Sequence, residues 1–405
     1  MQEFQRQLIE TLLKELTNSK VTLIFGPRQS GKSFLMNQIA NQVKGKFTYY
    51  DLEQPTDLRK FTGNDEDVQE LLLNSGKTVF IDEFHYLKNA GKIFKGIYDL
   101  GKRNPKKQIK IFASGSSAIE MHKHIKESMA GRVHKYQLMP LSLEEYSSIN
   151  LTKEDYFIYG GLPETYQYEG EERESYLNGI LETYIQKDIK SLVKEENISS
   201  FNKLIYMLAA NQGQVVSVSN LANDLSVSAQ TVQSYLDTLE QTYTLYPLKS
   251  FSNKLSNELK KSRKYYLYDL GIRNALIKDF SKLNERNDLS CIMESYVYHY
   301  LLFIANKANT DIFFWRTSKG SEVDFVWKRN QKLIPIEVKN KYEVSNLTKG
   351  METFMRYYPL TEKAIILFNK SNNFDDYQEI NLRGRTLYLI NIENAHLYLR
   401  DILQA

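Results

Sequence analysis

The sequence predicts a mixed α/β protein built from several domains, and three observations point to this fold class. The chain has 405 residues, which is too long for one ordinary hydrophobic core. Over about the first 145 residues, short apolar runs alternate with helix-period segments, as in a parallel sheet with crossover helices. Beyond about residue 260, a long helix pattern precedes another set of strand patterns. We therefore expect an α/β domain at each end of the chain.

The composition is typical of a soluble globular protein, with 42% apolar and 25% charged residues. The net charge of +4 permits contact with nucleic acid and is also explained by a well-solvated surface. The single cysteine, Cys291, excludes an internal disulfide and a metal site built from several cysteines. The chain has no signal-peptide pattern and no apolar run near the roughly 20 residues that span a bilayer. We expect a cytoplasmic protein without a membrane partner.

Four strand patterns are expected in the first domain, residues 1–145. They are "VTLIF" (21–25), "FTYYDLE" (47–53), "TVFIDEF" (78–84) and "IKIFASGS" (109–116). Turn residues or charges bound each of them, and the stretches between them have helical periodicity. This alternation predicts parallel strands whose carboxyl ends meet at one edge of the sheet.

Residues 26–33 read GPRQSGKS, which matches the pattern G-x-x-x-x-G-K-S of a phosphate-binding loop, or P-loop. The match follows a strand pattern and precedes a helix pattern, the context that this loop requires. Glycines let backbone N–H groups point at phosphate, and the helix adds its positive dipole end. Lys32 is expected to neutralise the β and γ phosphates, and Ser33 to ligate Mg²⁺. The residues expected around the nucleotide are Gly26, Pro27, Arg28, Gln29, Ser30, Gly31, Lys32, Ser33, Phe34 and Asp82.

Two adjacent acids end the strand pattern at 78–84. Asp82 is expected to hold Mg²⁺ through its water shell, and Glu83 to orient and deprotonate the attacking water. Two acids favour hydrolysis over binding alone, although an ordinary surface acid at Glu83 stays an alternative. Ser114 ends the next strand and is expected to sense the γ phosphate, with a turn or helix-capping serine as the alternative.

These motifs resemble the bacterial and archaeal AAA-type ATPases, whose phosphate loop often reads G-P-R-Q-x-G-K-[ST]. Later stretches are similar to the family in which this ATPase is fused to a domain of unknown function called DUF4143: "SMAGRVHKYQLMPLSLEEY", "YGGLPETY", "YLNGILETYIQKDI", "KYYLYDLGIRNAL" and "SEVDFVW...IPIEVK". The resemblance covers nearly the whole chain and implies a P-loop NTPase with ATP and Mg²⁺ as cofactors. It also implies that Arg132, in "AGR", touches the γ phosphate of its own subunit or a neighbour's. The second case requires a homo-oligomer, and a structural salt bridge is the alternative.

Two helical modules are expected between the end domains. Periodic stretches predict a helical lid at residues 146–200, and residues 201–252 have a winged helix-turn-helix pattern around "DLSV". Its second helix, from Ser228, is expected to expose polar residues that can contact DNA: Gln230, Thr231, Gln233 and Ser234. That helix has no Lys or Arg, so a structural or protein-binding module stays an alternative. The sequence "KKSRK" at 260–264 is the expected phosphate-facing patch.

The last domain, residues 253–405, combines three acids with a lysine: Glu294, Asp324, Glu337 and Lys339. If they converge, the acids can bind Mg²⁺ and activate water for phosphodiester cleavage. The pattern resembles the PD-(D/E)xK nucleases and implies a restriction-endonuclease-like fold, although Val323 replaces the proline of the motif. The alternative is a degenerate nucleic acid- or protein-binding domain whose acids pair with Arg316 and Lys339.

The histidines and tyrosines are not expected to form further sites. His85, His122 and His124 lack a third metal ligand at suitable spacing and are interpreted as loop or solvent-facing residues. The 28 tyrosines can stack on bases, but a core with a polar rim explains most of them. The sequence thus predicts an ATP-hydrolysing protein whose winged-helix and nuclease-like domains act on DNA. The alternative is a nucleotide-switched DNA- or protein-binding regulator that does not cut.

Overall fold

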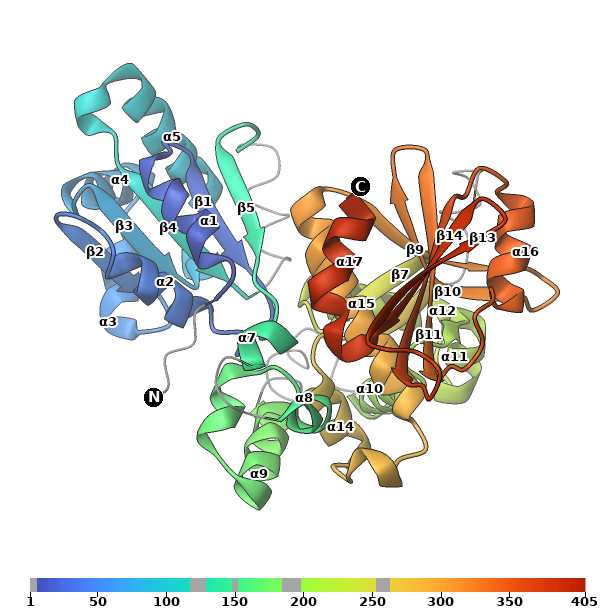
Figure 1. Ribbon diagram of the computed structural model, residues 1–405. Helices are drawn as coiled ribbons and strands as arrows, with labels where there is room; N and C mark the ends of the chain where they lie inside the picture. Colours follow the sequence, from blue (N-terminus) through green and yellow to red (C-terminus); the bar gives the residue numbers. More distant parts are fainter. Residues whose placement is uncertain (1–5, 117–128, 148–151, 184–197, 253–262, 405) are drawn as a thin grey trace. The chain divides into compact units, whose positions relative to one another are not determined.

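The computed structural model describes residues 6–116, 129–147, 152–183, 198–252 and 263–404 (Figure 1). The chain divides into two compact units. The first unit comprises residues 1–149, 161–169 and 237–244. The second unit comprises residues 150–160, 170–236 and 245–405.

A parallel five-stranded sheet forms the centre of the first unit. Its strands are β1 (Val21–Phe25), β2 (Phe47–Asp51), β3 (Thr78–Asp82), β4 (Lys110–Gly115) and β5 (Val133–Gln137). Their order is β2-β3-β4-β1-β5, and every pair is parallel. The predicted parallel sheet is confirmed. Strand β5 was not among the expected strands, because its sequence VHKYQ is polar and its side chains are only partly buried.

The register of the sheet gathers the ends of three strands at one edge. Ile24 of β1 lies opposite Ser114 of β4, and Ile81 of β3 lies opposite Ala113 of β4. Asp82 and Ser114 therefore lie at the edge where β1 leads into the phosphate loop. In open parallel sheets, ligands bind outside this carboxyl edge.

Helices cover both faces of this sheet. They are α1 (Ile9–Lys14), α2 (Lys32–Ala40), α3 (Pro55–Leu58), α4 (Asp65–Asn74) and α5 (Ala90–Arg103). Helix α7 (Leu143–Ser147) also belongs to the first unit. Successive strand residues point to opposite faces, so Leu23 packs in the core with α4 and α5, whereas Ile24 packs with α1 and α2. The start of α4 is fixed by a capping box between Asn64 and Asp67, which pairs backbone N–H groups that the helix leaves open.

The second unit contains a mixed nine-stranded sheet. Its strands are β6 (Val215–Val216), β7 (Leu245–Ser250), β8 (Arg263–Leu267), β9 (Asp311–Arg316), β10 (Glu322–Arg329), β11 (Lys332–Lys341), β12 (Lys363–Lys370), β13 (Tyr377–Leu382) and β14 (Arg385–Asn391). They lie in the order β13-β14-β12-β11-β10-β9-β7-β8-β6. Strands β9, β10 and β11 form an antiparallel meander, and β11, β12 and β14 are parallel. One sheet thus runs through the expected boundary at residue 253, and that boundary stays a prediction.

The remaining described helices complete the chain. They are α8 (Lys153–Tyr159), α9 (Gly170–Ile180), α10 (Ile198–Ala210), α11 (Val218–Leu225), α12 (Ala229–Gln241), α14 (Leu270–Ile277), α15 (Leu289–Ala308), α16 (Lys349–Tyr357) and α17 (Ala395–Gln404). Helices α8 and α9 lie within the segment expected to be a lid, and the lid stays a prediction. Across the residues that the structure describes, no helix combines the length and the apolar character needed to span a bilayer.

The helices of the expected winged helix are present as α11 and α12. Ser217 caps α11 by accepting from the backbone N–H of Asn220 at 3.4 Å, and Ser226 adopts a left-handed conformation (φ 54°) that ends it. Gln230 and Ser234 are exposed on α12, whereas Thr231 and Gln233 are half-buried. The winged-helix fold and its contact with DNA stay predictions.

Candidate functional site

The phosphate-loop motif forms the turn between β1 and α2 in the first unit. A β-carbon on Gly26 would lie 2.0 Å from the carbonyl oxygen of Leu138, so only glycine fits there. Gly31 has a left-handed backbone (φ 87°) and directly precedes α2. Both glycines of the motif are therefore favoured by the backbone: Gly26 by the close approach of a carbonyl oxygen, and Gly31 by its left-handed conformation. The loop leads into the N-terminus of α2, where backbone N–H groups and the helix dipole favour an anion.

Lys32 folds its side chain back onto this loop. Its Nζ donates hydrogen bonds to the carbonyl oxygens of Gly26 (3.2 Å) and Pro27 (2.9 Å). Burial lowers the pKa of Lys32, and the negative charges of Glu83 and Asp82 oppose that effect. The ammonium thus lies within electrostatic reach of both acids. Ser33 is exposed in the first turn of α2.

Asp82 lies buried at the end of β3 and contacts both neighbouring strands. The Ser114 hydroxyl of β4 donates to its Oδ1, and the Tyr49 hydroxyl of β2 donates to its Oδ2 at 3.0 Å. Burial and the charge of Asp82 raise the pKa of Tyr49 well above its usual range. Tyr49 was not expected in the site, because its role depends on strand order rather than on a local motif. Both oxygens of Asp82 are therefore held in place.

Glu83 adopts an unusual backbone conformation, with φ 49° and ψ 50°. Its Oε2 lies 3.0 Å from His85 Nδ1 and accepts hydrogen bonds from the backbone N–H and the hydroxyl of Ser116, both at 3.1 Å. Burial acts to raise the pKa of Glu83, but His85, the charge of Lys32 and Ser116 outweigh it and lower the pKa to about 2. The carboxylate is therefore charged at neutral pH and tightly held.

His85 lies in the connection that follows β3, so it fits the interpretation as a loop residue but not as a solvent-facing one. Its side chain is 16% exposed and lies against Glu83, because the short 3-10 helix Phe84–Tyr86 returns the chain to the end of β3. The spacing "DEFH", with a histidine two residues after Glu83, is the local signal for this contact. His122 and His124 lie outside the described residues.

Arg6, which no sequence motif indicated, contacts the phosphate loop through a hydrogen bond to Ser30. Its side chain is 2% exposed and donates to the carbonyl oxygens of Ser30 (2.9 Å) and Met139 (2.5 Å). Its Nε lies 3.2 Å from Glu145 Oε1. The segment before α1 is thereby tied to the loop. No motif marks this arginine, since it acts through long-range contacts.

Arg132 lies at the other end of the sheet from the phosphate loop. Its carbonyl accepts a hydrogen bond from the backbone N–H of Val21, the first residue of β1, whereas the loop follows the last residue of β1. Five strand residues, or roughly 16 Å of chain, separate the two ends. The Arg132 guanidinium pairs with Asp99 at 2.9 Å. Contact with the γ phosphate of its own subunit is therefore wrong, and contact with a neighbouring subunit stays a prediction.

In the second unit, the predicted acids are brought near one another but are already paired. Glu337 lies 2.8 Å from Lys339 and accepts from the Thr348 hydroxyl. Asp324 accepts from the backbone N–H of Val338 at 2.9 Å. Burial raises the pKa of Glu337, and the charge of Asp324 adds to this effect. We refer to Glu294, Asp324 and Glu337 as the acid cluster.

A buried lysine supplies positive charge to the acid cluster. Lys264 of β8 lies 3.1 Å from Glu294 and 2.8 Å from Glu322, with its side chain 3% exposed. Burial acts to lower the pKa of Lys264, but Glu294, Asp324 and Glu322 raise it to about 12. The expectation that the "KKSRK" patch faces phosphate is wrong for this residue, and residues 260–262 lie outside the described part of the chain.

The acid cluster does not form the expected metal site. Within the described residues, no group of three or more His, Cys, Asp or Glu side chains is arranged to hold a metal ion. Glu294 instead accepts from Lys264 and from the Tyr266 hydroxyl, the latter at 2.7 Å. Of the pairings in the alternative, Lys339 does pair with Glu337 at 2.8 Å, whereas Arg316 lies 3.6 Å from Glu322 instead. Lys264 thus supplies positive charge at Glu294, one of the three carboxylates that were expected to bind Mg²⁺.

Family models match three successive segments of the chain. Residues 18–147 match the AAA domain, residues 151–286 match a domain of unknown function (DUF8612), and residues 290–386 match a domain of unknown function (DUF4143). The predicted AAA domain and the predicted DUF4143 domain are confirmed by these matches. The middle match spans the segment that the sequence was expected to divide into a lid and a winged helix.

Curated relatives resemble the chain over most of its length. An uncharacterized protein of Mycobacterium tuberculosis is 23% identical over 365 residues, which cover 89% of this chain and 79% of the relative. One of Haemophilus influenzae is 23% identical over 396 residues, covering 87% of this chain and 94% of the relative. One of Methanocaldococcus jannaschii is 25% identical over 368 residues, covering 84% and 78%.

Solved structures resemble the chain only loosely. The Holliday junction branch migration motor RuvB of Thermotoga maritima gives a TM-score of 0.33 at 15% identity, covering 60% of this chain and 89% of that chain. The replication initiator DnaA bound to AMPPCP and single-stranded DNA gives 0.30 at 14% identity, covering 59% and 89%.

Proposed function

We infer that this chain, in which an AAA domain at residues 18–147 is joined to a DUF4143 domain at 290–386, binds ATP with Mg²⁺ in its first unit and hydrolyses it. One observation carries the proposal. The buried Lys32 begins α2 directly after the phosphate loop, and Asp82 and Glu83 follow at the end of β3, at the same edge of the sheet. A triphosphate needs a cation and backbone donors on one side, and acids that manage its metal ion and water on the other.

Phosphate binding would use groups that are already oriented. Backbone N–H groups of residues 28–31 and the N-terminus of α2 favour an anion. Lys32 would exchange the carbonyl oxygens of Gly26 and Pro27 for phosphate oxygens, which carry more negative charge and make stronger hydrogen bonds. Arg6 keeps the loop in place through the carbonyl oxygen of Ser30.

The residues present fit Mg²⁺, which prefers hard oxygen ligands. Ser33 offers an exposed hydroxyl, and Asp82 offers a carboxylate fixed by Ser114 and Tyr49 while still having lone pairs to spare. Mg²⁺ bound there would neutralise charge on the β and γ phosphates. Ser114 also accepts a hydrogen bond from the backbone N–H of Glu83 at 3.3 Å, so it contacts both acidic residues and helps to fix their positions.

Glu83 is the proposed general base, and its contacts indicate a restrained state. A carboxylate with a pKa of about 2 is a poor proton acceptor. Turnover therefore requires Glu83 to leave His85 and Ser116 and turn toward the attacking water. Arg132 of a neighbouring subunit is the proposed source of further positive charge at the γ phosphate, which would make activity depend on assembly.

The test is a comparison of ATP binding and phosphate release in the wild type and in Glu83→Gln. We expect the variant to bind ATP as the wild type does and to release phosphate about 10² to 10⁴ times more slowly, because only the base is lost. Glu70→Gln, an exposed carboxylate on α4, is the matched control and should behave as the wild type. Undiminished phosphate release by Glu83→Gln would remove Glu83 as the base.

A second candidate function concerns the second unit. We propose that its acid cluster does not cut nucleic acid and that the unit is a DNA- or protein-binding module under nucleotide control. The observation that favours this candidate is Lys264, whose ammonium is shared between Glu294 and Glu322. A divalent ion at the acid cluster would have to displace this buried cation or be repelled by it.

Incubation with ATP, Mg²⁺ or Mn²⁺ and labelled single- or double-stranded DNA tests this candidate. We expect intact DNA after incubation, and any DNA binding should weaken with salt and persist in Glu337→Ala. Cleavage by the wild type that disappears in Glu337→Ala, but not in the matched control Glu343→Ala, would establish a metal-dependent nuclease instead.

A further inference from the structure

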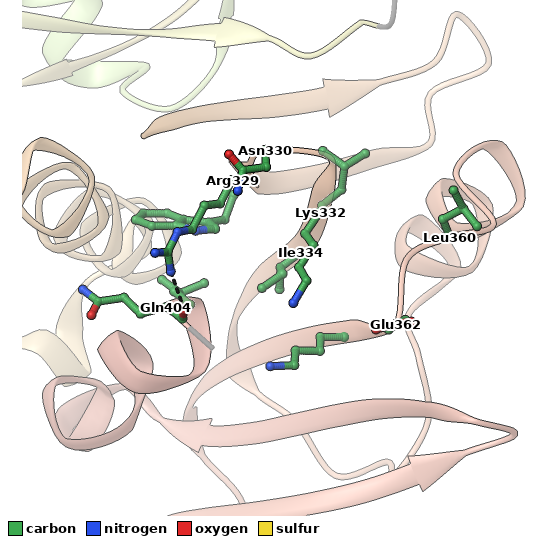
Figure 2. Close-up of a pocket in the computed structure, with 11 residues that line it drawn as sticks. Arg329, Asn330, Lys332, Ile334, Leu360, Glu362 and Gln404 are labelled. Carbon is green, nitrogen blue, oxygen red and sulfur yellow. Dashed lines mark hydrogen bonds between the residues drawn. The ribbon is translucent and has the colours of Figure 1, made fainter. Parts of the chain in front are cut away.

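A cavity of about 230 Å³ lies in the second unit, away from the acid cluster (Figure 2). It is bounded by the hairpin that joins β10 to β11, by the beginning of β12 and by the end of α17. Leu333, Ile334 and Leu403 form apolar walls. Leu360 lies on the rim and is 90% exposed. An exposed leucine beside an open cavity offers apolar surface that a ligand could cover.

Trp327 lines the cavity and has an unsatisfied donor. The side chain is 0% exposed, and its indole Nε1 finds no acceptor among the described residues. Buried indole N–H groups usually have a partner, since leaving one unpaired is unfavourable. The indole ring belongs to the cavity wall, whereas its Nε1 atom is covered by protein, so the ring can report on a ligand without bonding to it.

The polar lining of the cavity is mainly positive. Arg329, Lys332 and Lys363 contribute three positive charges, and Glu362 contributes one negative charge, so the excess is two (3 − 1). Figure 2 shows Arg329 and Lys332 extending from the hairpin, with Arg329 bonded to the carbonyl oxygen of Gln404. The Lys363 ammonium makes no ion pair with any residue that the structure describes. Such a lining favours an anion.

We propose that this cavity binds a small organic acid: a carboxylate attached to an apolar body of about one ring. The positive lining selects the carboxylate, and the leucine and isoleucine walls select the hydrocarbon part. The size follows from the volume, because a cavity of about 150 Å³ holds benzene, and this one has room for a carboxylate as well. This proposal does not rest on ATP binding, because the cavity lies wholly within the second unit.

Tryptophan fluorescence gives a direct test, because the chain has only two tryptophans, Trp315 and Trp327. In full-length Trp315→Phe, the emission comes from Trp327 alone. The probes are benzoate and hexanoate, each compared with its neutral alcohol, benzyl alcohol or hexanol. We expect a saturable change in emission with the two acids and at least a tenfold weaker response to the alcohols.

Lys363→Met in the same background should weaken binding of the acids at least tenfold, because it removes a cation and keeps the aliphatic stem. Lys349→Met, an exposed lysine outside the cavity, is the matched control and should bind as the parent does. Circular dichroism verifies that each variant is folded. The proposal is overturned if neither acid changes the emission. It is also overturned if the acids bind no better than the alcohols, or if Lys363→Met binds the acids as tightly as its parent does.

Discussion

Replacing Lys264 by methionine tests the idea that this lysine neutralises the acid cluster. The substitution keeps a flexible apolar stem and removes the ammonium that lies between Glu294 and Glu322. Breaking a buried ion pair by removing one partner costs about 3–5 kcal/mol, because the other charge stays buried without compensation. With a urea m-value of about 2–3 kcal/mol/M, this loss lowers the unfolding midpoint by roughly 1–2.5 M.

Urea unfolding followed by tryptophan fluorescence measures this loss where it occurs, since Trp315 and Trp327 both belong to the second unit. Lys349→Met is the control for the loss of one positive charge from the surface. It should change the free energy of unfolding by less than about 0.5 kcal/mol. A change as small as this in Lys264→Met would refute the reasoning, because it would mean that the acids do not need the ammonium.

The pH dependence of the same variant has a defined sign. Burial already raises the pKa of Glu294 above its model-compound value of 4.5, and the charge of Lys264 opposes that effect. Removing Lys264 raises the pKa of Glu294 further. Proton uptake by Glu294 on folding therefore stabilises the variant at low pH. Its deficit relative to the wild type should be largest near pH 8 and should shrink as the pH falls toward 5. A deficit that grows toward low pH would contradict the assignment.

Three further substitutions test the first unit. His85→Ala should raise the pKa of Glu83, the proposed base, and increase basal phosphate release severalfold at unchanged ATP affinity. Slower release in a folded variant would mean that the histidine assists catalysis. Tyr49→Phe removes a hydrogen bond to Asp82, worth about 1.5–3 kcal/mol for a charged acceptor. It should raise the Mg²⁺ concentration needed for half-maximal activity, and an unchanged Mg²⁺ titration would exclude this role. Gly26→Ala places a β-carbon 2.0 Å from a main-chain oxygen and should abolish ATP binding, whereas Gly179→Ala, which has free space, should not.

Local motifs predicted the part of the site that a continuous stretch of chain builds. The phosphate loop needs a glycine where a carbonyl oxygen approaches and another with a left-handed backbone, and both are visible in the spacing of Gly26 and Gly31. The pair at 82 and 83 follows from one strand with two acids at its end. The alternation of strands and helices likewise predicted the parallel sheet.

Residues that act across the fold could not be predicted in the same way. Tyr49 reaches Asp82 because β2 lies beside β3, and strand order is not written in a local pattern. Arg6 reaches Ser30 across 24 residues of chain. Lys264 belongs to a basic stretch that is typical of a protein surface. It nevertheless lies in β8 and is buried in the interior of the second unit. In each case the role depends on a contact with a residue distant in the sequence. The residue type alone suggested a different role or none.

The most direct test of the central claim is a calorimetric titration of the wild type, Lys32→Ala and Lys44→Ala with ATP and Mg²⁺. Lys44 is exposed and outside the phosphate loop, so it controls for loss of charge. We predict one ATP site per chain in the wild type and in Lys44→Ala, and at least a hundredfold weaker binding in Lys32→Ala, because a buried charge-assisted contact with the phosphates is lost. Equal ATP affinity in Lys32→Ala and the wild type would contradict the account.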